Sequence, residues 1–150
     1  MKARIYCYFL CLSFIVCACR EKKEEVIIGT IEKVHSSVLN ETREVWISLP
    51  KSYNKDDTTA RYPVLYVLDG NDHFHAVTGL VGQLSENFIM PEMIVVAVLN
   101  TDRSRDMTPT RSLKMPNGQE QDWLASTGGA ENLTKFIRDE LIPFIEKKYP

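Results

Sequence analysis

The distribution of apolar residues along the chain predicts two kinds of strand. Residues 26–38 and 44–49 are rich in Val and Ile, and the second stretch alternates apolar with polar positions. We expect these two stretches to pair as an antiparallel hairpin that turns near Asn40. Two later runs, residues 64–68 and 93–99, are apolar without alternation. Such runs are typical of strands that are buried on both faces.

Apolar residues recur at helical spacing between the two continuous runs, over residues 74–84. Strand, helix and strand in this order predict a parallel βαβ unit with a right-handed crossover. A second amphipathic stripe, residues 133–145, predicts another helix, and Pro143 should kink it because proline lacks a backbone donor. The polar residues 100–127 show no clear structure, and loops of that length are usually functional. We therefore expect an α/β fold whose mostly parallel sheet begins with an antiparallel hairpin.

The predicted sheet is incomplete. The last helix ends near Tyr149, and in an α/β fold such a helix normally leads into the next parallel strand. Only two clear parallel strands are predicted, and no internal repeat supplies more. We therefore expect residues 26–150 to be the N-terminal part of a longer domain.

Composition and charge exclude some classes of protein. The content of 44% hydrophobic and 25% charged residues is ordinary for a globular domain. The formal net charge is −2, and without residues 1–18 it becomes −4 because that segment carries two basic and no acidic residues. No basic stripe remains that could follow a phosphate backbone, so nucleic acid is not expected as a partner.

The first nineteen residues contain all four cysteines, so the fold cannot depend on disulfides within the domain. Residues 1–18 combine a basic start with an apolar stretch that is too short for a comfortable membrane span, and this pattern predicts a signal peptide. The four letters VCAC resemble a bacterial lipobox, in which Cys19 is lipidated and becomes the new N-terminus. Cys17 departs from that motif, and a plain signal peptide cut after Ala18 remains an alternative.

These signals place the mature protein outside the cytoplasm. With a lipid anchor on Cys19 we expect a membrane-bound lipoprotein of the periplasm or cell surface, and otherwise a secreted protein. Residues 19–25 are mostly charged and should form a solvated tether.

The polar residues after the first continuous run raise the question of a metal site. His73 and His75 stand beside Asp69 and Asp72, but on a helix the two histidines would point about 200 degrees apart and could not chelate one ion. The sequence contains neither GxxxxGK[ST] nor GxGxxG. We therefore expect no metal and no cofactor.

A second interpretation of the same residues is a ligand-facing turn. Asp69 and Gly70 end a buried strand that precedes a helix, and open α/β sheets bind ligands outside the carboxyl ends of their strands. The alternative is a purely structural turn, in which Gly70 adopts a positive φ and Asp72 caps the helix.

Three segments together resemble a known family. YPVLYVLDGNDHF, IVVAVLNTDRSRDMTPT and GGAENLTKFIRDELIPFIEKKYP are similar, in order and spacing, to the Putative esterase family of the α/β-hydrolase superfamily. That family includes siderophore-ester hydrolases similar to enterochelin esterase, feruloyl esterases and the esterase D group. The resemblance covers roughly residues 30–150. It implies an α/β-hydrolase-type fold, hydrolysis of small-molecule carboxylic esters and no cofactor.

The resemblance also implies roles for four residues. The loop after VLDG would provide one N–H of an oxyanion hole, from Gly70 or Asn71. Arg103 and Arg105 lie in the loop after the next strand, where they would supply charge on the substrate side or anchor the loop. The alternative is an internal Arg–Asp pair that merely folds this loop.

The family's nucleophile lies in a GxSxG elbow, which would come one strand after EKKYP, and its acidic residue and histidine follow later. No GxSxG occurs in the 150 residues, so we expect no catalytic residue within this chain. Residues 126–129, Ser-Thr-Gly-Gly, resemble such an elbow superficially but are interpreted as a helix-entry turn.

Three hypotheses about function follow from the sequence. The first is an exported serine hydrolase of carboxylic esters, of which this chain is the N-terminal half and is inactive alone. The second is a non-catalytic surface lipoprotein that uses the same scaffold to bind a ligand or partner. The third and weakest is a metal-dependent hydrolase built on the Asp and His residues near position 70.

Overall fold

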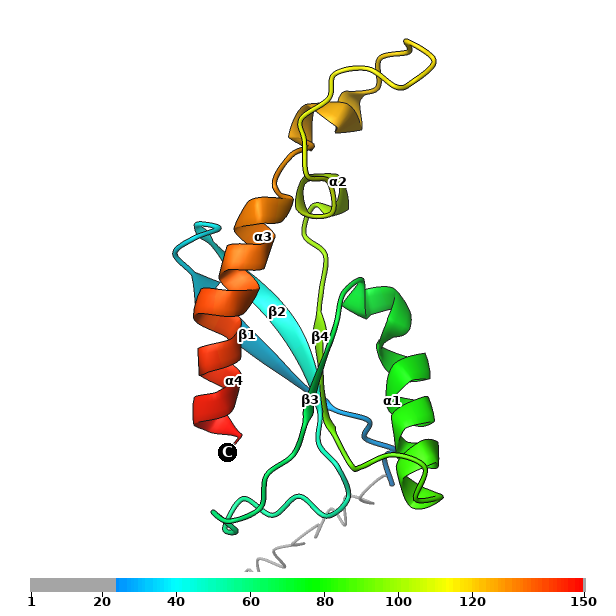
Figure 1. Cartoon of the computed structure of the whole chain (residues 1–150), viewed down its shortest axis with the longest axis vertical. Helices are drawn as coiled ribbons and strands as arrows, with labels where there is room; N and C mark the ends of the chain where they lie inside the picture. Colours follow the sequence, from blue (N-terminus) through cyan, green and yellow to red (C-terminus); the bar gives the residue numbers. More distant parts are fainter. Residues whose placement is uncertain (1–23, 150) are drawn as a thin grey trace, which may run out of the picture.

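The computed structural model describes residues 24–149 of the chain. In chain order its elements are β1 (Thr30–Ser36), β2 (Glu41–Ser48), β3 (Val64–Val67), α1 (Gly70–Glu86), β4 (Ile94–Val98), α2 (Arg103–Asp106), the 3-10 helix η1 (Asp122–Ser126), α3 (Ala130–Phe136), the π-helical turn η2 (Ile137–Leu141) and α4 (Ile142–Lys148). Figure 1 shows α1 on one side of the sheet and the α3–α4 helix on the other. The predicted signal peptide, Cys19 and most of the predicted tether lie outside the described residues.

The four strands form one mixed sheet in the order β1-β2-β4-β3. β1 pairs antiparallel with β2, and β2 pairs antiparallel with β4. β3 and β4 pair in parallel and are joined by α1, which confirms the predicted βαβ unit. The predicted hairpin is also confirmed, with Asn40 in the left-handed conformation at its turn. Its first strand begins at Thr30, later than the expected start at residue 26.

The central strand β4 explains why its sequence shows no alternation. All five of its residues are buried. Ile94, Val96 and Val98 contact the core on the α3–α4 side, whereas Val95 and Ala97 contact α1 on the other side. β3 is only half-buried, because among the described strands it has one neighbour. The expectation of full burial therefore holds for β4 and not for β3.

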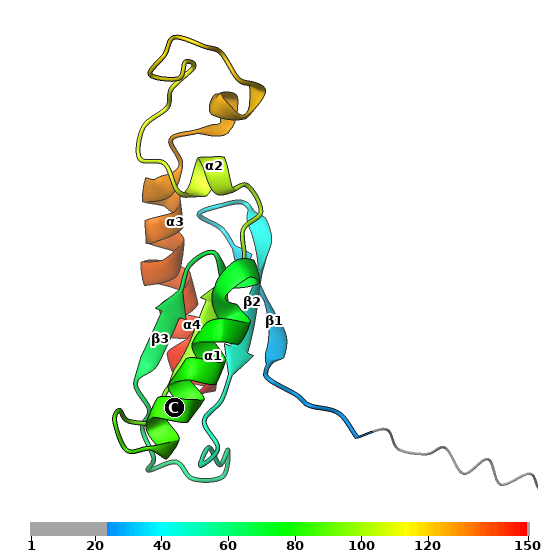
Figure 2. The same ribbon diagram turned by 90° about the vertical axis from the view of Figure 1, so that its right-hand side faces the viewer.

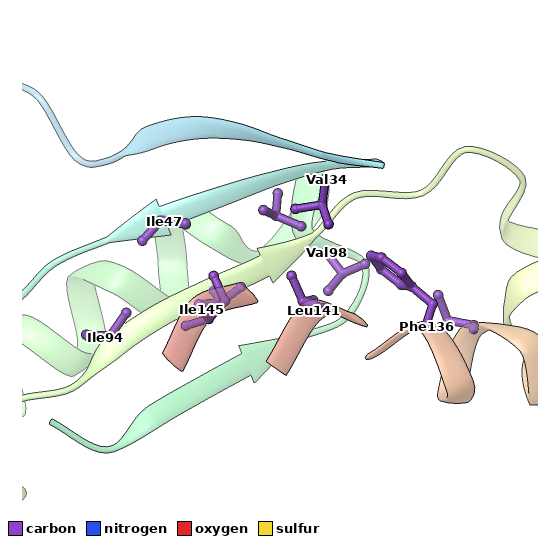
Figure 3. Close-up of a cluster of buried hydrophobic side chains, with 10 residues drawn as sticks. Val34, Ile47, Ile94, Val98, Phe136, Leu141 and Ile145 are labelled. Carbon is purple, nitrogen blue, oxygen red and sulfur yellow. The ribbon is translucent and has the colours of Figure 1, made fainter. Parts of the chain in front are cut away.

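The larger hydrophobic core lies between the sheet and the α3–α4 helix (Figure 3). Its buried members are Val34, Val45, Ile47, Ile94, Val96, Val98, Leu133, Phe136, Leu141 and Ile145. A smaller core on the opposite face packs Phe74 and Val81 of α1 against β4. Burial of apolar surface on both faces fixes the position of α1 over the parallel pair of strands.

The predicted C-terminal helix is one helical run from α3 through η2 to α4. Pro143 lies in the first turn of α4, directly after η2. A proline cannot donate to the carbonyl four residues earlier, and a π-helical turn is one way for a helix to absorb that loss. The expected disturbance at Pro143 thus takes the form of a local π turn.

The carboxylate of Glu140, within that π turn, holds the β1–β2 turn against the helix. Its oxygens accept hydrogen bonds from the Ser36 hydroxyl and from the backbone N–H groups of Ser37 and Val38, the last two at 2.8 and 3.1 Å. Burial alone would raise the pKa of Glu140, but these hydrogen bonds outweigh it and lower the pKa. The contact ties the antiparallel hairpin to the helix that covers it.

The segment between α2 and α3 extends beyond the edge of the sheet at which β3 and β4 end (Figure 2). This segment contains η1 and is otherwise irregular. The expectation that residues 100–127 lack regular structure therefore holds except for the two short helices α2 and η1. Among the described residues, no helix is long and apolar enough to cross a membrane.

Candidate active site

The carboxyl ends of β3 and β4 meet at one edge of the sheet because the two strands are parallel. At this edge β3 passes into α1 within two residues. Asp69 stands at the N-cap of α1 with φ 51° and ψ 45°, in the left-handed region. The helix therefore begins at Gly70, four residues before the apolar stripe of residues 74–84 that predicted it.

This geometry corrects the structural-turn alternative in two respects. The residue with positive φ is Asp69 and not Gly70. Asp72 lies in the first turn of the helix, and α1 has no side-chain cap. Gly70 is required for space instead, because a Cβ atom there would lie 2.9 Å from both the Cβ of Ala97 and the carbonyl oxygen of Val98. The glycine lets the start of α1 pack directly on β4.

The first N–H groups of a helix have no acceptor within the helix and point out of its N-terminus. In α1 the carbonyl of Asp69 accepts from the N–H groups of Asp72 and His73. Among residues 24–149 the backbone N–H groups of Gly70 and Asn71 have no acceptor, whereas the side-chain amide of Asn71 donates to Asp72 at 3.2 Å. The two predicted oxyanion donors are thus uncommitted, at the edge where α/β sheets bind ligands.

The Asp69 side chain is held from the loop that follows β4. Its Oδ1 accepts from the amide of Asn100 at 2.6 Å and from Nε of Arg103 at 2.9 Å, and its Oδ2 accepts from Nη2 of Arg103 at 3.0 Å. The hydrogen bonds from Arg103 and then Asn100 lower the pKa of Asp69. The loops after the two parallel strands are therefore joined by a charged contact.

A buried ionic network lies behind the same loop. The side chain of Arg43, only 1% exposed, donates to Asp106 at 2.5 Å and to the carbonyl of Leu99 at 3.1 Å. Its Nε lies 2.5 Å from Oε1 of Glu41 but lacks hydrogen-bond geometry, so we count that contact as an ion pair. Arg105 donates to Asp106 and to both oxygens of Glu41 at 2.8 to 3.2 Å. Two arginines thus share two carboxylates.

The two arginines predicted on the substrate side have different surroundings. Arg103 is 65% exposed and is engaged with Asp69. Arg105 is 31% exposed, and its hydrogen bonds to Asp106 and Glu41 raise its pKa. These contacts fit the alternative interpretation from the sequence, in which an internal Arg–Asp pair folds the loop and does not face the substrate.

The sequence interpretation missed Arg43, Glu41 and Asn100. One signal was available for Arg43, because it stands in register with Val45 and Ile47 on the inward face of an alternating strand. A charged residue at such a position indicates a buried ion pair. Asn100 carried no local signal, since its partner Asp69 is distant in sequence.

The remaining candidates near this edge show no catalytic arrangement. Among the described residues, no three His, Cys, Asp or Glu side chains gather in a way that could hold a metal ion. Ser126 closes η1, and its hydroxyl donates to Asp102 and to the carbonyl of Trp123. No strand leads into it, and Gly129 caps α3, so the helix-entry interpretation of residues 126–129 is confirmed.

Comparison with known proteins identifies the family to which the chain is similar. The family model described as "Putative esterase" matches residues 36–150. Ferri-bacillibactin esterase BesA from Bacillus subtilis is 31% identical over 121 residues, which cover 73% of this chain and 41% of that protein. The chain thus spans less than half the length of this curated relative.

Solved structures show the same fold. An IroE-like serine hydrolase from Shewanella oneidensis is 37% identical, with a TM-score of 0.74 over 81% of this chain and 39% of that one. The BES protein from Bacillus cereus is 30% identical, with a TM-score of 0.65 over 85% of this chain and 52% of that one. The chain therefore belongs to the Putative esterase family and has the α/β-hydrolase-type fold of that family.

Proposed function

We propose that this chain is the oxyanion-hole half of an exported serine hydrolase that cleaves carboxylic esters. The observation that carries the proposal is the family match over residues 36–150. The geometry at the sheet edge supports it, because the uncommitted N–H groups of Gly70 and Asn71 are suited to a negatively charged oxygen.

The reaction assigns this half of the protein a specific task. A serine supplied by the polypeptide beyond Pro150 attacks the ester carbonyl, and a histidine takes its proton. Negative charge then develops on the carbonyl oxygen, and the N–H of Asn71 or Gly70 donates to it. Removal of one such donor typically raises the barrier by about 2.7 to 4 kcal/mol.

The relatives support a substrate class within the esters. The curated relative at 31% identity is a ferri-bacillibactin esterase, and a solved relative at 37% identity is an IroE-like serine hydrolase. We propose esters of the kind that a ferri-bacillibactin esterase hydrolyses.

The first test compares two proteins. The 150-residue chain should not hydrolyse a chromogenic short-chain ester or ferri-bacillibactin above background, because GxSxG is absent from it.

The coding sequence beyond Pro150 should give an apolar strand and a GxSxG within roughly 10 to 20 codons, the length of one strand and its turn. The protein made from that longer sequence should hydrolyse both esters, and serine-to-alanine replacement in GxSxG should abolish turnover. Activity of the short chain that a chelator removes would instead support a metal-dependent hydrolase.

Export and anchoring form the second part of the proposal. The lipobox-like VCAC supports lipidation of Cys19, which would attach the enzyme to a membrane. Cells fed an alkyne fatty acid should label the wild-type protein and a Cys11→Ser variant, because Cys11 lies in the predicted leader. The Cys19→Ser variant should lose the label. An unlabelled wild-type protein would favour the plain signal peptide cut after Ala18.

A further inference from the structure

We infer that Asp69, Asn100 and Arg103 form a clamp that positions the oxyanion donors of α1 without touching the substrate. This inference rests on the proposed function, and it assigns Arg103 a positioning role in place of the substrate-side role expected from the sequence. It also assigns a task to Asp69, the charged residue at the end of the strand.

The clamp first accounts for the backbone of Asp69. Non-glycine residues seldom adopt the left-handed conformation, and Asp and Asn do so more readily than most. The conformation turns the chain from β3 into α1 without an intervening loop, so that the N–H groups of Gly70 and Asn71 emerge at the edge of the sheet. Sparsely populated conformations of this kind persist where the surrounding structure holds them.

Side-chain hydrogen bonds hold Asp69 in this conformation. Arg103 donates to both oxygens of the Asp69 carboxylate at 2.9 and 3.0 Å, and Asn100 donates to one of them at 2.6 Å. A two-point contact between guanidinium and carboxylate fixes orientation as well as distance. The Asp69 side chain is 17% exposed, so solvent competes little for its oxygens.

Arg103 is itself held by the turn of α2. The Asp102 carboxylate caps this turn by accepting from the N–H of Arg105 at 3.0 Å. Arg105 and Asp106 then join the buried network of β2. A rigid path of contacts therefore runs from the buried hairpin through α2 to the start of α1.

Gly70 limits the position of α1 on the side that faces β4. Its backbone packs on Ala97 and Val98, so α1 cannot move toward β4. Asp69 is held by Arg103 and Asn100, and Gly70 packs against β4. The backbone N–H groups of Gly70 and Asn71 therefore keep one orientation before the substrate binds. Oxyanion donors are effective when they are already oriented in this way.

The test uses the longer protein that hydrolyses esters, with the variants Arg103→Gln, Arg103→Lys and the control Arg138→Gln. Arg138 is a matched control, since it is also 65% exposed and also grips a neighbouring carboxylate, at 2.6 and 2.7 Å. Arg103→Gln should lower kcat roughly 10- to 100-fold with KM changed less than about twofold, because the donors act mainly in the transition state. Arg103→Lys should recover part of the loss, and Arg138→Gln should match the wild type.

Two results would overturn the clamp. A rise in KM at unchanged kcat would make Arg103 a substrate contact. Wild-type kinetics in Arg103→Gln would show that the donors need no such support. Equal thermal unfolding midpoints of Arg103→Gln and Arg138→Gln would exclude global destabilisation as the cause of any loss.

A second readout separates the clamp from the proposed function. Amide hydrogen exchange at Gly70 and Asn71 should be faster in Arg103→Gln than in Arg138→Gln, whether or not the protein hydrolyses esters. If the wild type shows no esterase activity, the proposed function fails while this exchange measurement still decides the clamp. Equal exchange in the two variants would contradict it.

Discussion

At the scale of single residues, the chain places charge where its pattern is otherwise apolar. Arg43 occupies an inward position of β2, and its side chain and that of Asp106 are each 1% exposed. A buried charge is costly unless it is paired, and removal of one partner leaves the other without compensation. The effect of each charge on stability therefore depends on its partner, both in the pair of Arg43 and Asp106 and in the pair of Asp69 and Arg103.

The first prediction concerns the buried pair. Arg43→Ala should lower the free energy of unfolding by about 3 to 5 kcal/mol, because Asp106 would remain buried and partly unpaired. Lys33→Ala is the control, since Lys33 is 70% exposed and pairs with Glu44 on the surface, where such pairs contribute at most about 1 kcal/mol. Urea unfolding of the chain followed by circular dichroism measures both. Equal losses in the two variants would contradict the network.

The second prediction concerns pH. Hydrogen bonds from Arg103 and Asn100 hold the pKa of Asp69 below its ordinary value of 3.8. A carboxyl group with a lowered folded-state pKa stabilises the fold fully above the unfolded value and loses that contribution as pH falls through the folded value. Wild type should thus unfold at a higher temperature than Asp69→Asn at neutral pH, and the difference should shrink below pH 3.8. A difference that stays constant down to about pH 2.5 would show that the charge is not responsible.

At the scale of elements, α1 is fitted to the sheet by a glycine at its first position. Gly70 has backbone and side-chain atoms of β4 against it, whereas a Cβ atom at Gly79 in the same helix would meet no atom within 4 Å. The same residue type therefore has opposite roles at the two sites. One permits close packing, and the other only weakens the helix.

The third prediction follows from this contrast. Gly70→Ala should destabilise the fold by about 1 to 3 kcal/mol, because the new methyl group would press against the backbone of β4. Gly79→Ala should stabilise it by about 0.5 to 1 kcal/mol, since alanine restricts the unfolded chain and favours the helix. Thermal unfolding of the two variants beside the wild type measures both signs. A stabilising Gly70→Ala would refute the close packing of α1 on β4.

The elements themselves were largely predictable from the sequence. The continuous apolar run at β4 and the helical stripe of α1 are local patterns, and both were found where expected. The helix begins earlier than this stripe indicates, because Asp69 in the left-handed conformation, which no local pattern demands, lets it begin at Gly70. The clamp was not predictable, because Asn100 and Arg103 reach Asp69 across more than thirty positions of sequence through a parallel strand pair.

At the scale of the whole molecule, the start of α1 and the Asp69–Arg103 contact lie at one edge of the sheet. The ends of β3 and β4, the start of α1 and the turn of α2 meet there, and the long segment before α3 extends beyond it (Figures 1 and 2). The same positions belong to a family whose model matches residues 36–150. We therefore propose that this chain provides the oxyanion donors and that polypeptide beyond Pro150 provides the nucleophile.

The central claim, that the start of α1 binds the oxyanion of an ester intermediate, is tested most directly by a covalent inhibitor. The serine of a serine hydrolase displaces the leaving group of a phosphonate ester, and the polarised phosphonyl oxygen of the resulting tetrahedral adduct occupies the place of the oxyanion of the reaction. In a crystal structure of the longer protein treated with such an inhibitor, this oxygen should lie about 2.7 to 3.1 Å from the backbone nitrogen of Asn71 or Gly70. A phosphonyl oxygen bound by other groups, with both N–H donors turned away, would contradict the account.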